Sequence, residues 1–207
     1  STKTIVDPTK LPERVSTIAL DCFDLDGLEM RNFMVRVNPD INNELNTYYL
    51  TYSEDYDAWV ETTDGYVNTI DPETMPVSIR KSKANSLIVE HSPINEPLAG
   101  DNLSNAMPSF VGKKIKDLVV FNSRLGYASE NTLVFSVVND FFNVFRTTAS
   151  SFLVADVVDL ELDSTKLGFR QIDNVFTLDN NIMVNTGLSQ SMLAVPTNLD
   201  ISGAIFA

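Results

Sequence analysis

Hydrophobic and polar residues alternate over short stretches of this chain, and turn-forming residues separate the stretches. The segment 28–37 illustrates this, because every second residue from Phe33 is aromatic or β-branched. That two-residue period is typical of a half-buried β-strand. Asp26-Gly27 separates the segment from the apolar run 15–25, and Asp-Gly favours the backbone of a two-residue hairpin turn. The pattern therefore predicts an antiparallel strand pair.

Turn residues of the same kind predict two more hairpins. These are Asp64-Gly65 between residues 56–62 and 66–70, and Asp179–Asn181 between residues 174–178 and 182–185. Further short apolar runs, each of strand length or longer, occur at residues 77–80, 87–90, 118–121, 152–162 and 192–195. Many short strands joined by turns are typical of an antiparallel sandwich or barrel. We therefore expect a mainly β fold.

One segment has a different period. Between residues 129 and 148, apolar residues recur at spacings of three and one, at Val134, Val137, Val138, Phe141, Phe142 and Phe145. This stripe predicts a single α-helix packed on the sheets, with Ser129 or Asn131 as its N-cap. The Val and Phe residues lower helix propensity, so a pair of strands is the alternative.

Residues 92–112 lack any periodicity and contain three prolines and several asparagines. Unstructured segments of this length are uncommon inside a compact domain. We expect a long loop or arm that contacts something outside its own domain. The preferred organisation is one β-rich domain over residues 1–207, and the alternative is two lobes, 1–91 and 113–207.

Composition narrows the class of protein. The chain has 207 residues and a net charge of −13, with 43% hydrophobic and 21% charged residues. Such a composition excludes wholesale disorder, and no apolar run is long enough to span a bilayer. The negative charge argues against sequence-specific nucleic-acid binding, which needs clustered Lys and Arg. An acidic protein can still line a DNA conduit without binding the DNA.

The sequence offers little catalytic or metal-binding chemistry. His91 is the only histidine and Cys22 the only cysteine, so an intrachain disulfide and a multi-thiolate metal site are excluded. The chain has no G-x-S-x-G motif, and Asp24–Glu29 lacks the later ligands of a calcium loop. We therefore expect no enzymatic activity, no metal site and no cofactor.

The N-terminal residues also lack the features of a secretory signal, since Ser1–Thr4 supplies neither a basic nor an apolar region. The first residue is Ser, which indicates either removal of an initiator Met or cleavage of a precursor.

The main compositional anomaly is residues 38–79, which we call the acidic-aromatic segment. It contains nine acidic residues and no Lys or Arg. It also holds the only tryptophan and five of the six tyrosines, namely Trp59, Tyr48, Tyr49, Tyr52, Tyr56 and Tyr66. Aromatic residues dominate binding hot spots, so the segment is a candidate interaction face. The alternatives are an ordinary half-buried sheet with acid facing water, and a glycosidase-like carboxylate pair.

Basic partners for such a face exist in the lysine cluster, which consists of Lys113, Lys114 and Lys116. Together these observations favour a non-catalytic structural subunit that self-assembles, such as a capsid, tail-tube or decoration protein of a virus or phage. Its partners would be copies of itself and other assembly subunits. Its location would be the virion, or otherwise the cytoplasm. The alternative function is a carbohydrate- or protein-binding module that uses the acidic-aromatic segment.

Overall fold

The computed structural model describes residues 15–19, 34–37, 45, 47–53, 55–56, 58–65, 69–83, 85–162, 171–187, 189–194 and 205–206. These residues form antiparallel strands and one short 3₁₀ helix, η3 (Pro72–Thr74). The predicted mainly β, antiparallel class is confirmed. The chain divides into two compact units, each built from three stretches. Unit 1 comprises residues 1–68, 97–106 and 146–153, and unit 2 comprises residues 69–96, 107–145 and 154–207.

Unit 1 contains a four-stranded sheet. Its strands, in sheet order, are β1 (Val15–Ala19), β2 (Met34–Val37), β3 (Tyr48–Ser53) and β4 (Ala58–Thr62). Val37 and Leu50 are buried at its centre, against the half-buried Tyr48 and Trp59. The predicted pairing around Asp26-Gly27 corresponds to β1 and β2, which are antiparallel. The turn itself lies outside the described residues.

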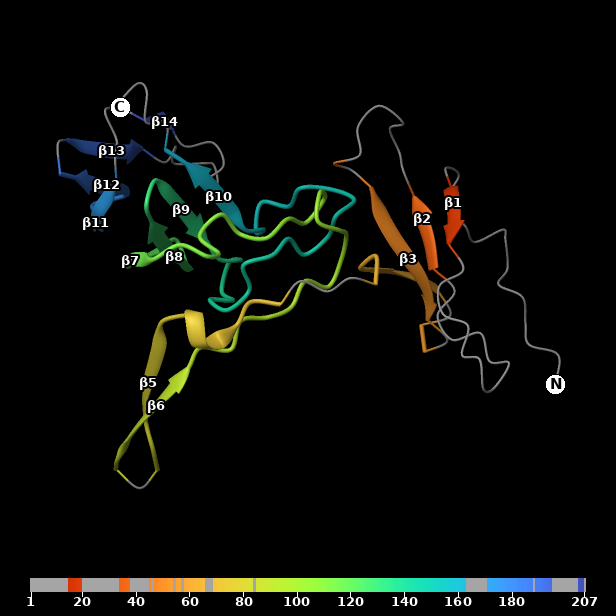
Figure 1. The fold of residues 1–207 in the computed structure, drawn as a ribbon, viewed down its shortest axis with the longest axis horizontal. Helices are drawn as coiled ribbons and strands as arrows, with labels where there is room; N and C mark the ends of the chain where they lie inside the picture. Colours follow the sequence, from red (N-terminus) through yellow and green to blue (C-terminus); the bar gives the residue numbers. More distant parts are fainter. Residues whose placement is uncertain are drawn as a thin grey trace. The chain divides into compact units, whose positions relative to one another are not determined.

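Unit 2 is built around two four-stranded sheets (Figure 1). The first has the order β10 (Val158–Glu161), β9 (Thr132–Phe135), β8 (Arg124–Ser129), β7 (Ile115–Phe121). The second has the order β11 (Ile172–Leu178), β12 (Asn181–Thr186), β13 (Gln190–Ala194), β14 (Ile205–Phe206). Side chains from both sheets share one core, which includes Phe121, Leu133, Phe135, Ile182 and Leu193. This is the arrangement of a β-sandwich.

The predicted helix over residues 129–148 is wrong. Residue 129 ends β8, residues 132–135 form β9, and Glu130 and Asn139 adopt positive φ angles of 46° and 61°, which a helix does not allow. All four residues of β9 are buried, because the strand has one core on each face. A strand buried on both sides has no two-residue alternation, so its apolar run resembles part of a helical stripe. The strand alternative is correct for residues 132–135.

The other predicted turns had different outcomes. Asp179-Asn180 joins β11 to β12 as a two-residue turn, with Leu178 opposite Asn181, so that hairpin is confirmed. Asp64-Gly65 does not lead into a described strand. Thr63 instead forms a parallel bridge with Gly100, and residues 69–70 are not in a strand. The remainder of that predicted arm, residues 66–68, lies outside the described residues.

Residues 92–112 form a long loop without strands, but contacts with their own chain hold this loop at many points. The Asn95 backbone amide donates to the Phe142 carbonyl oxygen at 2.9 Å, and the Ser109 hydroxyl donates to Asp159 at 2.5 Å. Phe110 is only 2% exposed and packs on Tyr127, with ring centroids 5.1 Å apart. The loop therefore contributes to the packing of the fold.

Candidate interaction site

The expected aromatic residues occupy different positions in unit 1. Tyr48 and Tyr49 lie on β3 and Trp59 lies on β4, and all three are half-buried. Tyr56 lies in the turn between these strands and is 77% exposed. The side chain of Tyr52 and the whole of Tyr66 lie outside the described residues. Tyr56 is thus the described tyrosine of this segment that is most available to a partner.

Glu61 is the acidic residue of β4, and its carboxylate is engaged within unit 1. It accepts hydrogen bonds from the Thr148 hydroxyl at 2.5 Å, the Ala149 amide at 2.6 Å and the Ser150 amide at 3.2 Å. These bonds attach residues 146–153 to the sheet. The Glu61 carboxylate thus has a structural role within unit 1.

A second carboxylate, Asp101, has a similar role. It accepts hydrogen bonds from the amides of Leu103 and Ser104, both at 2.9 Å, and from the Tyr49 hydroxyl at 3.0 Å. Burial alone would raise the pKa of Asp101, but these hydrogen bonds outweigh it and hold the pKa below its usual value. Burial, together with the bond to Asp101, raises the pKa of Tyr49 to about 12. The pair therefore stays as a neutral phenol and an ionised carboxylate at neutral pH.

The same region contains a tight backbone junction at Gly100. The Gly100 amide donates to the Thr62 carbonyl oxygen, and the Gly100 carbonyl accepts from the Asp64 amide, each at 3.0 Å. Arg146 completes the junction, because its guanidinium donates to the Ser104 carbonyl at 2.6 Å and lies 3.8 Å from the Phe152 ring centroid. Sequence reasoning missed Asp101 and Arg146 as anchoring residues. The Asp-x-x-Ser spacing of residues 101–104 was the available signal for a local side-chain turn.

The lysine cluster lies at the start of β7 in unit 2. Lys114 and Lys116 are exposed and Lys113 is half-buried. The Lys114 carbonyl accepts a hydrogen bond from the Ser129 hydroxyl at 3.1 Å, which fixes the backbone but leaves the ammonium groups at the surface. Such groups can meet acidic partners, although exposed ion pairs are individually weak.

The remaining chemistry-bearing residues in the described part of the chain form no larger cluster. His91 is exposed at the end of β6 (Leu87–His91), and Cys22 lies outside the described residues. Among the residues that the structure describes, no three His, Cys, Asp or Glu side chains are grouped so that they could hold a metal ion. No helix in the described part of the chain is long and apolar enough to cross a membrane.

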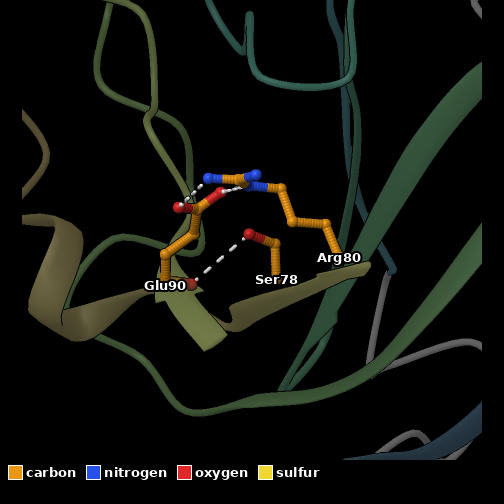
Figure 2. A network of polar contacts seen from close by, with 3 residues as sticks. All are labelled: Ser78, Arg80 and Glu90. Atoms are coloured by element: carbon orange, nitrogen blue, oxygen red, sulfur yellow. Dashed lines mark hydrogen bonds and ion pairs between the residues drawn. The ribbon is translucent and has the colours of Figure 1, made fainter. Parts of the chain in front are cut away.

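A further exposed surface lies on the β5–β6 hairpin, residues 77–91, formed by β5 (Val77–Lys81) and β6. Figure 2 shows its polar side, where Arg80 pairs with Glu90 at 2.7 Å and the Ser78 hydroxyl donates to the Glu90 carbonyl oxygen at 3.4 Å. The hairpin also exposes four large apolar residues, namely Val77, Ile79, Leu87 and Val89.

Comparison with known proteins adds two findings. A family model described as bacteriophage nozzle protein matches residues 21–193 of the chain. The chain is also 27% identical, over 138 residues, to the tail tubular protein gp12 of Escherichia phage T7. That similarity covers 65% of this chain but 17% of the T7 protein, so the chain spans a small part of the length of this relative.

Proposed function

Because the chain belongs to the bacteriophage nozzle protein family and is a structural subunit of a phage tail, we propose that it associates with copies of itself and with other tail subunits in the virion. The observation that carries this proposal is the family match, which extends over most of the chain, residues 21–193. The T7 relative is itself a tail tubular protein. We propose that the role is non-catalytic, with the chain contributing surfaces rather than a reaction.

The engaged carboxylates support the absence of catalysis. Glu61 and Asp101 each accept three or more hydrogen bonds from groups of unit 1. A glycosidase needs one protonated and one ionised carboxyl group facing a substrate. In this chain the two carboxylates instead attach loops to the sheet.

The charge of the chain supports a passive relation to DNA. With a net charge of −13, the mean field repels phosphate, so DNA moving past such a protein would not adhere to it. A gel-shift titration with duplex DNA tests this, and we expect no complex at physiological salt. A complex that resists 0.2 M salt would contradict the proposal.

We also propose that the exposed Tyr56 and the lysine cluster belong to contact surfaces of the assembly, together with the other aromatic residues of the acidic-aromatic segment. Tyrosine supplies a large contact area at low entropy cost, and Tyr56 is 77% exposed. The Lys114 and Lys116 ammonium groups provide charges opposite to those of the segment.

We further infer that residues 1–207 behave as one folding domain. Each unit is assembled from three separate stretches of chain, so neither can be completed from a contiguous half. A single cooperative unfolding transition is expected, with fluorescence and circular dichroism giving the same midpoint.

Sedimentation velocity over a range of concentrations tests the self-association. We expect a concentration-dependent shift from monomer to oligomer. A chain that remains monomeric at every concentration would overturn the proposal. The second candidate, a carbohydrate-binding module, is favoured only by the exposed Tyr56. A glycan array with wild type and Tyr56→Ala tests it, and binding that the substitution abolishes would support it.

A further inference from the structure

The β5–β6 hairpin carries an apolar face that nothing in the described structure covers. Its register places Val77 opposite His91, Ile79 opposite Val89 and Lys81 opposite Leu87. Because alternate residues of a strand share a face, all six side chains lie on one side of the ribbon. The four apolar members are 52% (Val77), 65% (Ile79), 73% (Leu87) and 61% (Val89) exposed.

The opposite side of the ribbon already has its polar contacts. Arg80 and Glu90 pair there, with bonds of 2.7 and 3.3 Å from the guanidinium to the two carboxylate oxygens (Figure 2). The described strands form no third neighbour for this two-stranded sheet. Two-stranded ribbons are marginally stable in water without such support, and clustered exposed apolar residues mark interaction sites. The apolar face is therefore suited to a partner.

Charge indicates which partner fits. The hairpin, residues 77–91, contains Arg80, Lys81 and Lys83 against Glu90, a net charge of +2. The rest of the chain then carries −15, which is the total of −13 less this +2. The acidic-aromatic segment alone has nine acids and no base. A basic, apolar ribbon is thus complementary to the acidic part of another copy.

We propose that the β5–β6 hairpin of one copy docks on residues 38–73 of a second copy, the part of the acidic-aromatic segment that contains all nine of its acidic residues. The apolar face supplies the buried area, and Lys81 and Lys83 face carboxylates of the neighbour. The inference rests on the self-association proposed above and names the element that produces it.

The first test removes the apolar contact. Ile79→Ser/Val89→Ser changes the centre of the exposed face, and Leu118→Ser/Val120→Ser is the matched control on β7, where these residues are 41% and 58% exposed. We expect the hairpin variant to raise the dissociation constant of self-association at least tenfold, and the control to change it less than twofold. Thermal unfolding of both variants verifies that the fold is retained.

The outcomes separate the two proposals. If wild type associates and the hairpin variant associates equally well, the docking proposal is wrong and self-association stands. If both double variants weaken association equally, the effect is not specific to the hairpin and the docking proposal is likewise overturned. If wild type does not associate at all, self-association fails and the docking proposal fails with it.

The second test compares two double variants that have the same net charge but carry the change at different places. Lys81→Gln/Lys83→Gln and Thr177→Glu/Asn180→Glu each change the charge of −13 by two units, to −15, and Thr177 and Asn180 are exposed in the β11–β12 hairpin. We expect the lysine variant to weaken association more than the control at 0.05 M salt. The difference should shrink at 0.5 M salt, where screening shortens the range of charge interactions. Equal effects of the two variants would show that only total charge matters.

The third test locates the contact directly. A photoreactive group on Ser86→Cys, an exposed turn position of the hairpin that leaves Lys81 and Lys83 in place, is activated in a Cys22→Ser background in a mixture of isotopically light and heavy copies. We expect crosslinks between light and heavy chains that map to residues 38–73. Crosslinks confined to single chains, or directed to other regions of the second copy, would overturn the proposed occupant.

Discussion

At the residue scale, two glycines with similar backbone angles have different surroundings. Gly100 has a φ of +81° and Gly112 a φ of +77°. A Cβ at Gly100 would approach the Ser104 hydroxyl oxygen to 2.7 Å and the Ala149 Cβ to 2.8 Å, whereas nothing lies within 4 Å of one at Gly112. The two positions therefore separate backbone strain from steric conflict.

We expect Gly112→Ala to lower the free energy of unfolding by about 1–2 kcal/mol, because the left-handed backbone conformation is unfavourable for an L residue with a Cβ atom. Gly100→Ala should cost about 1–3 kcal/mol more, since it also overpacks the junction of residues 97–106 with residues 146–153. Urea unfolding of both variants measures the difference. Equal losses would mean that the junction can relax around a methyl group.

Two hydroxyls of this chain should make it sensitive to alkali. Burial raises the pKa of Tyr127 to about 12, and its hydroxyl donates to the Phe141 carbonyl at 3.0 Å. Burial and Asp101 raise the pKa of Tyr49 to about 12 as well. An unfolded tyrosine ionises near pH 10, so the unfolded chain loses these protons first. The stability due to the raised pKa values is thus fully present below about pH 10 and is lost as pH rises toward 12.

Tyr127→Phe tests this. At neutral pH the variant should lose about 1 kcal/mol, because the buried hydrogen bond is removed. Between pH 10 and 12 the free energy of unfolding of the variant should fall less steeply with pH than that of wild type. The two slopes should differ by up to about 1.4 kcal/mol per pH unit. Tyr56→Phe removes an exposed hydroxyl and is the control. Parallel curves for wild type and Tyr127→Phe would contradict the assignment.

At the scale of elements, the turn between β7 and β8 is a two-residue loop with an uncommon backbone. Phe121 pairs with Arg124, and Asn122 and Ser123 have φ angles of 46° and 59°. Two successive positive φ values are typical of a type I′ turn, for which Asn-Gly is the favoured sequence. Ser123 is thus a strained residue in an otherwise suitable turn.

We expect Ser123→Gly to stabilise the protein by about 0.5 kcal/mol, because relief of left-handed strain exceeds the entropy cost of glycine. For a chain of this length, the midpoint of thermal unfolding should rise by about 1–2 °C. Thr177→Gly in β11 is the contrasting variant and should destabilise by about 0.5–1 kcal/mol. A fall in the midpoint for Ser123→Gly would show that the Ser123 side chain stabilises the turn.

In the β8–β9 pair, one buried side chain also holds neighbouring segments that lack regular secondary structure. Arg124 is 2% exposed, and its guanidinium donates to the backbone carbonyls of Ser136, Asp156 and Val154. These bonds hold residues 136 and 154–156 beside the sheet without any helix. The bonds to the Ser136 and Asp156 carbonyls are buried, so Arg124 supplies donors to acceptors that are shielded from water.

At the scale of the whole molecule, the net charge of −13 opposes any assembly of identical copies. Raising salt from about 0.01 to 0.15 M shortens the Debye length from roughly 30 to 8 Å and screens this repulsion. If apolar contacts such as the β5–β6 face dominate, association should strengthen over this range. Sedimentation at the two salt concentrations measures it, and dissociation on adding salt would contradict the prediction.

The loop at residues 92–112 is also bonded to the rest of its own chain more extensively than its sequence suggests. Its prolines and polar residues predict an arm that contacts something outside its own domain. In the structure, Asn105 donates to the Ala99 and Arg146 carbonyls, and Gly100 bonds to the end of β4. Removal of about ten residues around Gly100 is therefore expected to prevent the chain from folding, which circular dichroism would detect.

Local sequence patterns were sufficient to predict the β class, the turn at Asp179-Asn180 and the scarcity of catalytic groups. Each of these depends on local chemistry: the period of the strands, the backbone preference of Asp and Asn, and the types of residue present. Segments such as 77–81 and 87–91 were recognisable as strands for the same reason.

Which faces of the strands are covered becomes apparent only from the packing of the folded chain. Residues 132–135 have a core on both sides, so their apolar run mimics part of a helix, whereas Ile79 and Val89 have the same hydrophobic character and face solvent. Likewise, composition does not distinguish Glu61 and Asp101 from the other acidic residues. The hydrogen-bond donors of Glu61 come from residues distant in sequence. Burial and partner choice depend on long-range packing, and a local pattern does not contain that information.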